Sequence, residues 1–181
     1  MSHTYYYLAS SLPFLSFGKE PSISYHHFLS ECKRIMPQSD YEIIHDAQLF
    51  PTDYAISHNV CLNDWNQFCN HCCNEMARFR ASRAGKNPLD YLKGDISLDP
   101  FIADTIIEAS KAKDPLLGEM ILDEKRWEYL ETLSAYHVFD LEFLVIYALK
   151  LQILERHAAI ASLKGQEIFE DLKKTSLAIV S

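Results

Sequence analysis

The sequence predicts an all-α fold, a compact bundle of about six to eight helices around one long buried helix. The 181-residue chain holds only five Gly and seven Pro, so long stretches lack the two strongest helix breakers. Hydrophobic residues make up 48% of the chain, which is enough for a substantial core. Residues 138–163 are apolar on nearly every side, as expected of a helix surrounded by its own domain.

Residues 138–163 form the predicted central helix. Asp140 is its expected N-cap, because the carboxylate can accept a hydrogen bond from a backbone N–H group of the first turn. Between Leu141 and Leu154 only three residues are polar: Glu142, Lys150 and Gln152. We do not expect this helix to cross a membrane, since a span needs about 20 apolar residues.

The chain before residue 60 predicts shorter elements. Residues 5–17 are aromatic and apolar but interrupted by Pro13. Residues 5–7 could begin a strand or a first helical turn, and we favour an extended segment packed on the body. A helix is expected from about residue 21 to 36. Residues 41–50 predict a short helix that Pro51 closes, and residues 51–60 predict a loop.

Residues 62–84 predict a second long helix, followed by Gly85 at the position where helices often take a left-handed residue. One arc of this helix is apolar: Leu62, Trp65, Phe68, Cys69, Cys72, Cys73, Met76 and Phe79. Arg80 and Arg83 continue the same arc. The end of the helix is therefore expected either to leave the core or to offer cations to an acidic group.

Two Asp-Pro pairs predict the next helix starts. Asp99-Pro100 begins a helix near 100–112, and Asp114-Pro115 begins another, each with Asp as N-cap and Pro in the first turn. Asp123 then falls in the middle of an apolar face. We expect a break there, with Asp123 capping a new turn, because a continuous buried helix would not tolerate the charge.

The chain predicts a single helical domain over residues 1–181, and residues 86–99 are the best place for a weak internal boundary. Pro88 begins a short helical piece within that stretch, and Gly94 breaks it.

Charge and motifs argue against several classes of function. The net charge of −8 and the lack of a long basic run disfavour nucleic acid as a partner. The first ten residues hold no Lys or Arg, unlike a secretory signal, so the five cysteines predict reduced cytosolic thiols. No nucleophile elbow or phosphate-binding loop occurs, and we expect neither enzymatic activity nor a bound cofactor.

Cysteines and histidines concentrate in one 16-residue stretch: His58, Cys61, Cys69, His71, Cys72 and Cys73. Their spacing matches no zinc knuckle or ribbon, and three of the thiols lie on the apolar arc. Buried structural thiols are therefore the main interpretation. The alternative is a small metal- or thiol-dependent protein that uses His58, Cys61 and Cys69.

Four cations gather at the end of the second long helix: Arg78, Arg80, Arg83 and Lys86. One interpretation is a solvated helix end, where cations suit the helix dipole. The other is a docking patch for an acidic protein. The sequence favours neither of the two.

Three stretches resemble a known family. These are residues 5–13, residues 79–88 (FRASRAGKNP) and, most specifically, residues 126–156, with RWEYL followed by HVFDLEFLVIYALKLQILER. They are similar to bacterial proteins whose genes lie among those of V-type ATPase subunits. These proteins look like shortened relatives of the C-type subunit of that ATPase (d-type in eukaryotes), the socket between its central shaft and its membrane ring. The resemblance implies a helical protein without catalytic or nucleotide-binding residues.

The resemblance further implies an accessory or stalk subunit of a proton- or sodium-translocating ATPase or ATP synthase. Such a protein would be cytoplasmic and peripheral to the inner membrane through the other subunits, which would be its partners. The C-type socket has three helical lobes and this chain is too short for three, so a stalk adaptor or assembly factor is also implied. A helical scaffold unrelated to the ATPase stays open as an alternative.

Overall fold

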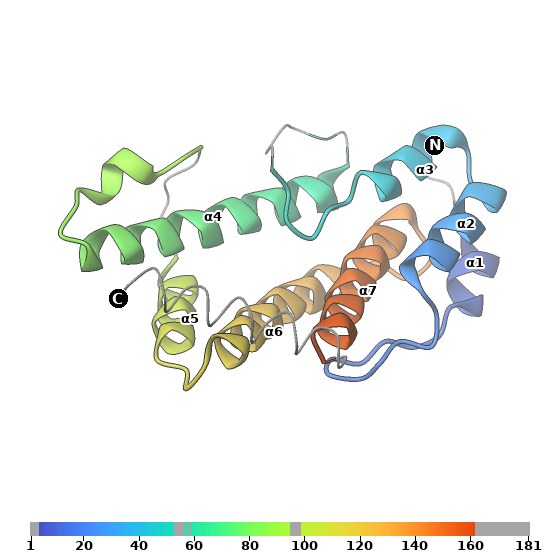
Figure 1. Cartoon of the computed structure of the whole chain (residues 1–181). Helices are drawn as coiled ribbons and strands as arrows, with labels where there is room; N and C mark the ends of the chain where they lie inside the picture. Colours follow the sequence, from blue (N-terminus) through green and yellow to red (C-terminus); the bar gives the residue numbers. More distant parts are fainter. Residues whose placement is uncertain (1–3, 53–56, 58, 95–98, 162–181) are drawn as a thin grey trace.

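The computed structural model describes residues 4–52, 57, 59–94 and 99–161. This part of the chain is helical and contains no strand, which confirms the predicted all-α fold. Its elements are α1 (Tyr6–Ser11), α2 (Tyr25–Ile35), α3 (Gln38–His45), α4 (Val60–Arg83), the 3-10 helix η1 (Pro88–Tyr91), α5 (Pro100–Ser110), α6 (Pro115–Ser134) and α7 (Leu141–Ala161). Figure 1 shows α1–α3 gathered beside α7 at one end, with η1 and α5 at the other.

Helix α7 forms the centre of the hydrophobic core, as predicted. Its buried side chains lie on all sides: Leu144, Val145, Ile146, Tyr147, Leu149, Leu151, Ile153 and Leu154. Asp140 caps it, since its Oδ1 accepts a hydrogen bond of 3.0 Å from the Phe143 N–H. The predicted continuation to residue 163 lies outside the described residues.

The polar residues of α7 attach neighbouring segments to it. Gln152 accepts a hydrogen bond of 3.0 Å from the Leu49 N–H and donates one of 2.8 Å to the Ala47 carbonyl. Lys150 lies 2.9 Å from Glu131 of α6. A helix without a polar face is stable here because its few polar side chains form hydrogen bonds and an ion pair with neighbouring segments instead of with water.

Helices α4 and α6 meet through aromatic rings. The rings of Phe68 and Tyr129 are stacked with their centroids 4.1 Å apart. The Tyr129 hydroxyl also donates to the Asp64 carbonyl at 3.2 Å. Trp65 is fully buried beside them, and its Nε1 donates to the Gln48 carbonyl at 3.0 Å. This cluster fixes α4 along the side of the core.

The predicted C-terminus of α4 and the predicted starts of α5 and α6 are confirmed. Gly85, just beyond α4, has a φ of 66°, the left-handed conformation that glycine adopts without strain. Asp99 caps α5 by accepting from the Phe101 N–H at 2.9 Å, and Asp114 caps α6 by accepting from Leu117 at 2.8 Å.

Helices α5 and α6 approach each other closely at Gly118. A Cβ on this residue would lie 2.8 Å from the backbone oxygen of Ala109, so only glycine fits without a shift of the helices. Glycine at this position therefore allows α5 and α6 to lie in close contact.

Two predictions for the N-terminal part are wrong. Residues 6–11 are helical rather than extended. The Tyr5 N–H is bonded to the Phe139 carbonyl at 2.6 Å, and Leu8 of this helix is buried in the hydrophobic core. The chain is extended only from Leu12. The helix predicted over 41–50 instead occupies Gln38–His45, because Gln152 binds the backbone of the next residues.

Among the described residues, every helix is too short or too polar to span a bilayer. The predicted boundary over 86–99 stays a prediction, since η1 and Gly94 lie within it and residues 95–98 are not described.

Candidate functional site

Asp123 is fully buried in the middle of an unbroken helix. The predicted break at this residue is wrong, because α6 runs without interruption from Pro115 to Ser134. A buried carboxylate needs charged or hydrogen-bonding partners. It finds them on its own helix and on α7, a helix distant in sequence.

Three side chains converge on the Asp123 carboxylate. Its Oδ1 accepts from Arg126 Nη1 at 2.6 Å. Its Oδ2 lies 3.0 Å from Nε2 of His157 and also accepts from Arg156. Both oxygens are therefore occupied, and two of the three partners come from α7. This arrangement explains why a continuous α6 tolerates the charge.

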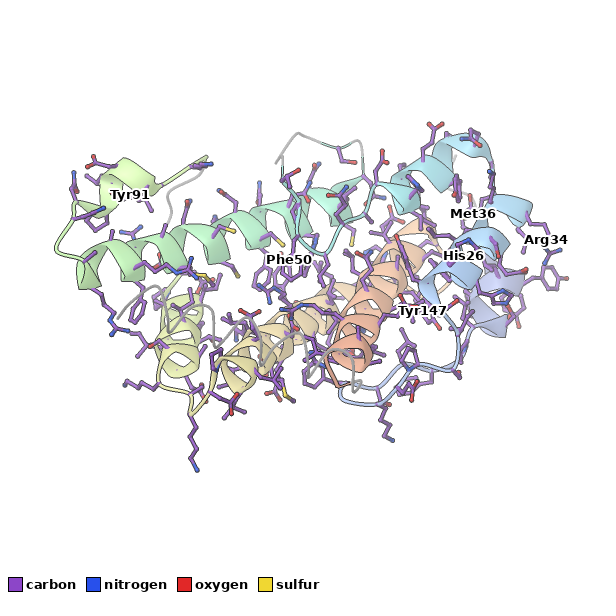
Figure 2. The ribbon with its side chains drawn as sticks, viewed as in Figure 1. His26, Arg34, Met36, Phe50, Tyr91 and Tyr147 are labelled. Carbon is purple, nitrogen blue, oxygen red and sulfur yellow. The ribbon has the colours of Figure 1, made fainter. Side chains whose placement is uncertain are left out.

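Arg156 joins this cluster to a second carboxylate and to an aromatic ring. Its Nη2 lies 2.7 Å from Oε2 of Glu119. The guanidinium carbons of Arg126 and Arg156 lie 4.8 and 5.3 Å from the centroid of the Phe50 ring, a cation–π arrangement. Phe50 is labelled near the middle of the molecule in Figure 2. We call Glu119, Asp123, Arg126, Arg156 and His157 the Asp123 cluster.

A cavity of about 570 Å³ lies beside the Asp123 cluster. The wall of the cavity is mostly apolar and includes Leu116, Met120, Leu154 and Ile160. The Asp123 carboxylate also lies in this wall, where its three partners hold it. The charged groups of the Asp123 cluster pair with one another, and Lys19 and Glu20 also line the cavity. Chemically, the cluster is an ion network that joins α6 to α7.

A second cavity, of about 550 Å³, lies between α4, α5 and α6. Its apolar lining comes from all three helices and includes Met76, Phe79, Ile106 and Leu122. Arg80 and Arg83 line it from the end of α4, and Glu119 lines it from α6. We call this cavity the α4–α6 groove.

The arginines of the groove have no acidic partner among the residues that the structure describes. Arg80 and Arg83 are exposed and form no ion pair there. Arg83 instead lies over the Phe79 ring, 5.7 Å from its centroid. The apolar arc of α4 thus ends in an accessible cationic rim.

The other two predicted cations are directed elsewhere. Arg78 Nε lies 3.5 Å from Oε1 of Glu75, which is buried. Lys86 lies over the Tyr91 ring of η1, 5.9 Å from its centroid. Of the four residues singled out in the sequence, only Arg80 and Arg83 share the groove.

The cysteines do not assemble into a metal site among the described residues. Cys61 and Cys69 are buried and lie eight residues apart on α4, which is about 12 Å along the axis, too far to share one ion. Burial raises the pKa of Cys61 and Cys72 to about 12. His58 lies outside the described residues.

One expectation about the cysteines is wrong. Cys73 is exposed, although the helical periodicity places it on the apolar arc. It lies next to Cys72, which is only partly buried, so it marks the edge of the arc and not its middle.

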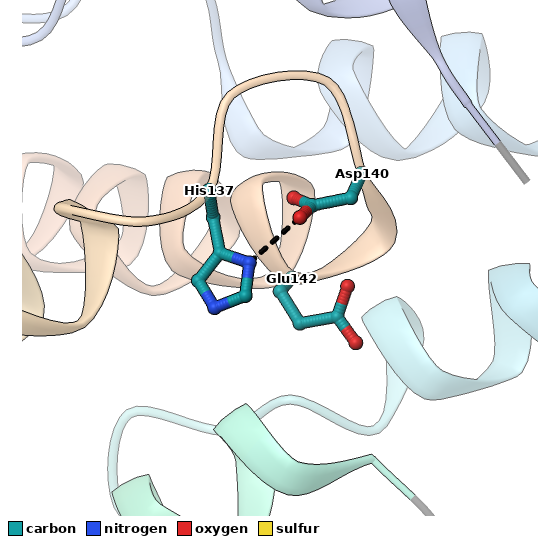
Figure 3. A group of neighbouring side chains, drawn as sticks. All are labelled: His137, Asp140 and Glu142. Carbon is teal, nitrogen blue, oxygen red and sulfur yellow. Dashed lines mark hydrogen bonds and ion pairs between the residues drawn. The ribbon is translucent and has the colours of Figure 1, made fainter. Parts of the chain in front are cut away.

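One group of described residues has the geometry of a metal site, although the spacing of these residues in the sequence does not indicate one. Figure 3 shows His137, Asp140 and Glu142, whose ligand atoms lie within 4.8 Å of one another. The Asp140 oxygens are engaged, by His137 Nδ1 at 2.7 Å and by the Phe143 N–H. The group also sits at the N-terminus of α7, where the helix dipole repels a cation. We therefore interpret these residues as the N-terminal cap of α7 and not as a metal site.

Part of the chain matches a known protein family. Residues 101–176 match a family described as proteins of unknown function, DUF2764. The match begins in α5 and takes in α6 and α7, and therefore the whole Asp123 cluster. No curated protein and no solved structure matches the chain.

Proposed function

We propose that this chain is a non-catalytic accessory or stalk component, related to the C-type socket, of a V-type proton- or sodium-translocating ATPase or ATP synthase. It acts through protein–protein contacts. The observation that supports this role best is the α4–α6 groove, where Arg80 and Arg83 stand without acidic partners among the described residues, at the edge of an apolar surface.

The two charged regions differ in how their charges are paired. The chain carries 25 acidic residues, and the fully buried carboxylate of Asp123 is paired inside the protein with Arg126, Arg156 and His157. Arg80 and Arg83 are left accessible next to apolar side chains. Apolar contact with a cationic rim provides affinity and orientation toward an acidic protein surface, as a stalk contact requires.

The resemblance of residues 126–156 to the ATPase-associated family suggests the complex. In this chain the stretch forms the contact between α6 and α7, so the resembling residues belong to the core. The proposed protein is cytoplasmic and reaches the inner membrane only through other subunits.

The test is affinity purification of the tagged, full chain from native membranes, followed by identification of the co-purifying proteins. We expect ATPase stalk or ring subunits to be recovered in constant ratio to the chain. Recovery of other proteins in such a ratio, with no ATPase component, would indicate a helical scaffold unrelated to the ATPase.

A further inference from the structure

We propose that the α4–α6 groove binds one amphipathic helix with an acidic face from a partner protein, and that Arg156 keeps the groove cationic by holding Glu119. This inference rests on the proposed function for the identity of the partner, but its chemistry is argued from the groove alone.

The lining of the groove suits the apolar face of a helix. Met76 and Phe79 contribute from α4, Ile106 from α5 and Leu122 from α6, so the apolar surface is spread over three elements. A volume of about 550 Å³ accommodates several large side chains, which a helix presents at positions i, i+3, i+4 and i+7.

The groove is built on fixed elements. Gly118, which lines it, brings α6 against the backbone of Ala109 in α5, and the α4 wall extends from the packed Trp65 and Phe68. Binding therefore needs little rearrangement, which lowers its entropic cost.

The charge of the groove selects an acidic partner. Arg80 and Arg83 are its cations, and neither forms an ion pair in the described part of the chain. Glu119 is the acidic residue of the lining, and Arg156 holds its Oε2 at 2.7 Å. Carboxylates on one flank of a bound helix would form ion pairs with the two arginines, whereas lysines there would be repelled.

Arg156 acts on the groove through Glu119. It approaches from α7, on the side of the first cavity, while Glu119 lines both cavities. Without Arg156, the Glu119 carboxylate is free to turn toward Arg80 and Arg83 and to compete with the partner. Arg156 is thus a positioning residue for the groove as well as a partner of Asp123.

The experiment measures binding of fluorescent helical peptides to the isolated full-length protein by anisotropy. The probe is a peptide of about five turns with leucines at i, i+3, i+4 and i+7 and glutamates beside them. Its two counterparts carry lysines in place of the glutamates, or the same composition in scrambled order. We expect saturable binding of the acidic amphipathic peptide and at least about tenfold weaker binding of both counterparts.

Two double variants locate the binding. Arg80→Glu with Arg83→Glu should weaken binding at least about tenfold. Lys111→Glu with Lys113→Glu changes the net charge equally but alters a different hollow of the α5–α6 surface, and binding should stay unchanged. Equal loss in both variants, or no loss in the first, would overturn the proposal.

Glu119 and Arg156 are tested together, because Arg156→Gln also weakens the Asp123 cluster. Arg156→Gln should weaken peptide binding, and the added change Glu119→Gln should restore it. A folding defect cannot give this restoration, since the second change removes a further ion-pair partner without repairing the first. Binding that stays weak in the double variant would show that Glu119 does not control the charge of the groove.

The occupant is identified by photo-crosslinking from a reactive residue at position 84, which lines the groove. A crosslink to the acidic peptide is expected. A crosslink to this chain's own residues 162–181 or to a second copy, in the presence of peptide, would contradict a foreign helix as occupant.

Peptide binding without ATPase subunits in the membrane purification would refute the proposed function alone. ATPase subunits retained by Arg80→Glu, Arg83→Glu would refute the groove alone.

Discussion

The carboxylate of Asp123 on α6 lies 3.0 Å from the imidazole Nε2 of His157 on α7, although 34 residues separate them. Arg156 and Arg126 complete the contact from both helices. The cluster is therefore a specific polar link between the central helix and α6, in addition to the ion pair between Lys150 and Glu131.

Removing the Asp123 charge should strongly destabilise the protein. Asp123→Asn leaves Arg126, Arg156 and His157 facing one another without the carboxylate, and we expect a loss of about 3–5 kcal/mol in the free energy of unfolding. Urea unfolding followed by circular dichroism measures this loss. Glu124→Gln, at the exposed neighbouring position, is the control and should leave the midpoint almost unchanged. An unchanged midpoint for Asp123→Asn would show that the cluster contributes no stability.

Gly118→Ala should destabilise the protein, against the usual trend for a helix. At an ordinary helical site alanine is about 1 kcal/mol better than glycine. Here the added Cβ would meet the Ala109 carbonyl at 2.8 Å, so α5 and α6 must separate, and we expect a net loss of about 1–3 kcal/mol. Glu128→Ala, exposed on the same helix, should be nearly neutral. A rise in melting temperature for Gly118→Ala would mean that the two helices are not in close contact.

Leu144→Asp or Leu151→Asp should prevent stable folding. Both leucines are fully buried on α7, and an unpaired carboxylate there costs several kcal/mol, a large part of the stability of a domain of this size. Soluble expression and thermal melting report the result. Val138→Asp, at a position 58% exposed just before α7, is the control and should melt like the wild type. Cooperative melting of the buried variants at the wild-type temperature would refute the central position of α7.

One cysteine should react quickly with a thiol reagent in the native protein. Cys73 is exposed, whereas Cys32, Cys61 and Cys69 are buried. Burial raises the pKa of Cys32 and Cys61 to about 12, so almost none of the reactive thiolate is present at pH 8. Titration with a chromogenic disulfide should show one fast equivalent, lost in Cys73→Ser and joined by the other thiols on unfolding. Several fast equivalents in the native state would contradict the burial.

Much of the helical framework could be predicted because its signals are local. The Asp-Pro starts at 99 and 114, Gly85 after α4 and the apolar sequence of α7 each depend on neighbouring residues only. By contrast, α1 escapes prediction because its start depends on the Phe139 carbonyl, far away in the sequence. Local propensity cannot indicate such a contact.

The Asp123 cluster could not be predicted for the same reason. A lone Asp on an apolar face signals a break, unless cations from another helix neutralise it. The partners of Asp123 from the other helix, the Arg156 guanidinium and the His157 imidazole, lie on α7, and no periodicity links them to α6. The accessibility of Arg80 and Arg83 follows from the sequence as one of two options. That Ile106 and Leu122 complete a groove beside them follows only from the packing of α4, α5 and α6.

The most direct test of the central claim compares recovery of ATPase stalk subunits by three tagged chains purified from native membranes. These are the wild type, Arg80→Glu with Arg83→Glu, and the matched Lys111→Glu with Lys113→Glu. All three should melt alike. We predict that the arginine variant recovers at least about tenfold less of these subunits, roughly 1.4 kcal/mol of binding free energy, while the lysine variant recovers as much as the wild type. Equal recovery of these subunits by all three chains would contradict the claim that the chain binds them through Arg80 and Arg83. Recovery of no ATPase component with any of the three would contradict the ATPase assignment itself.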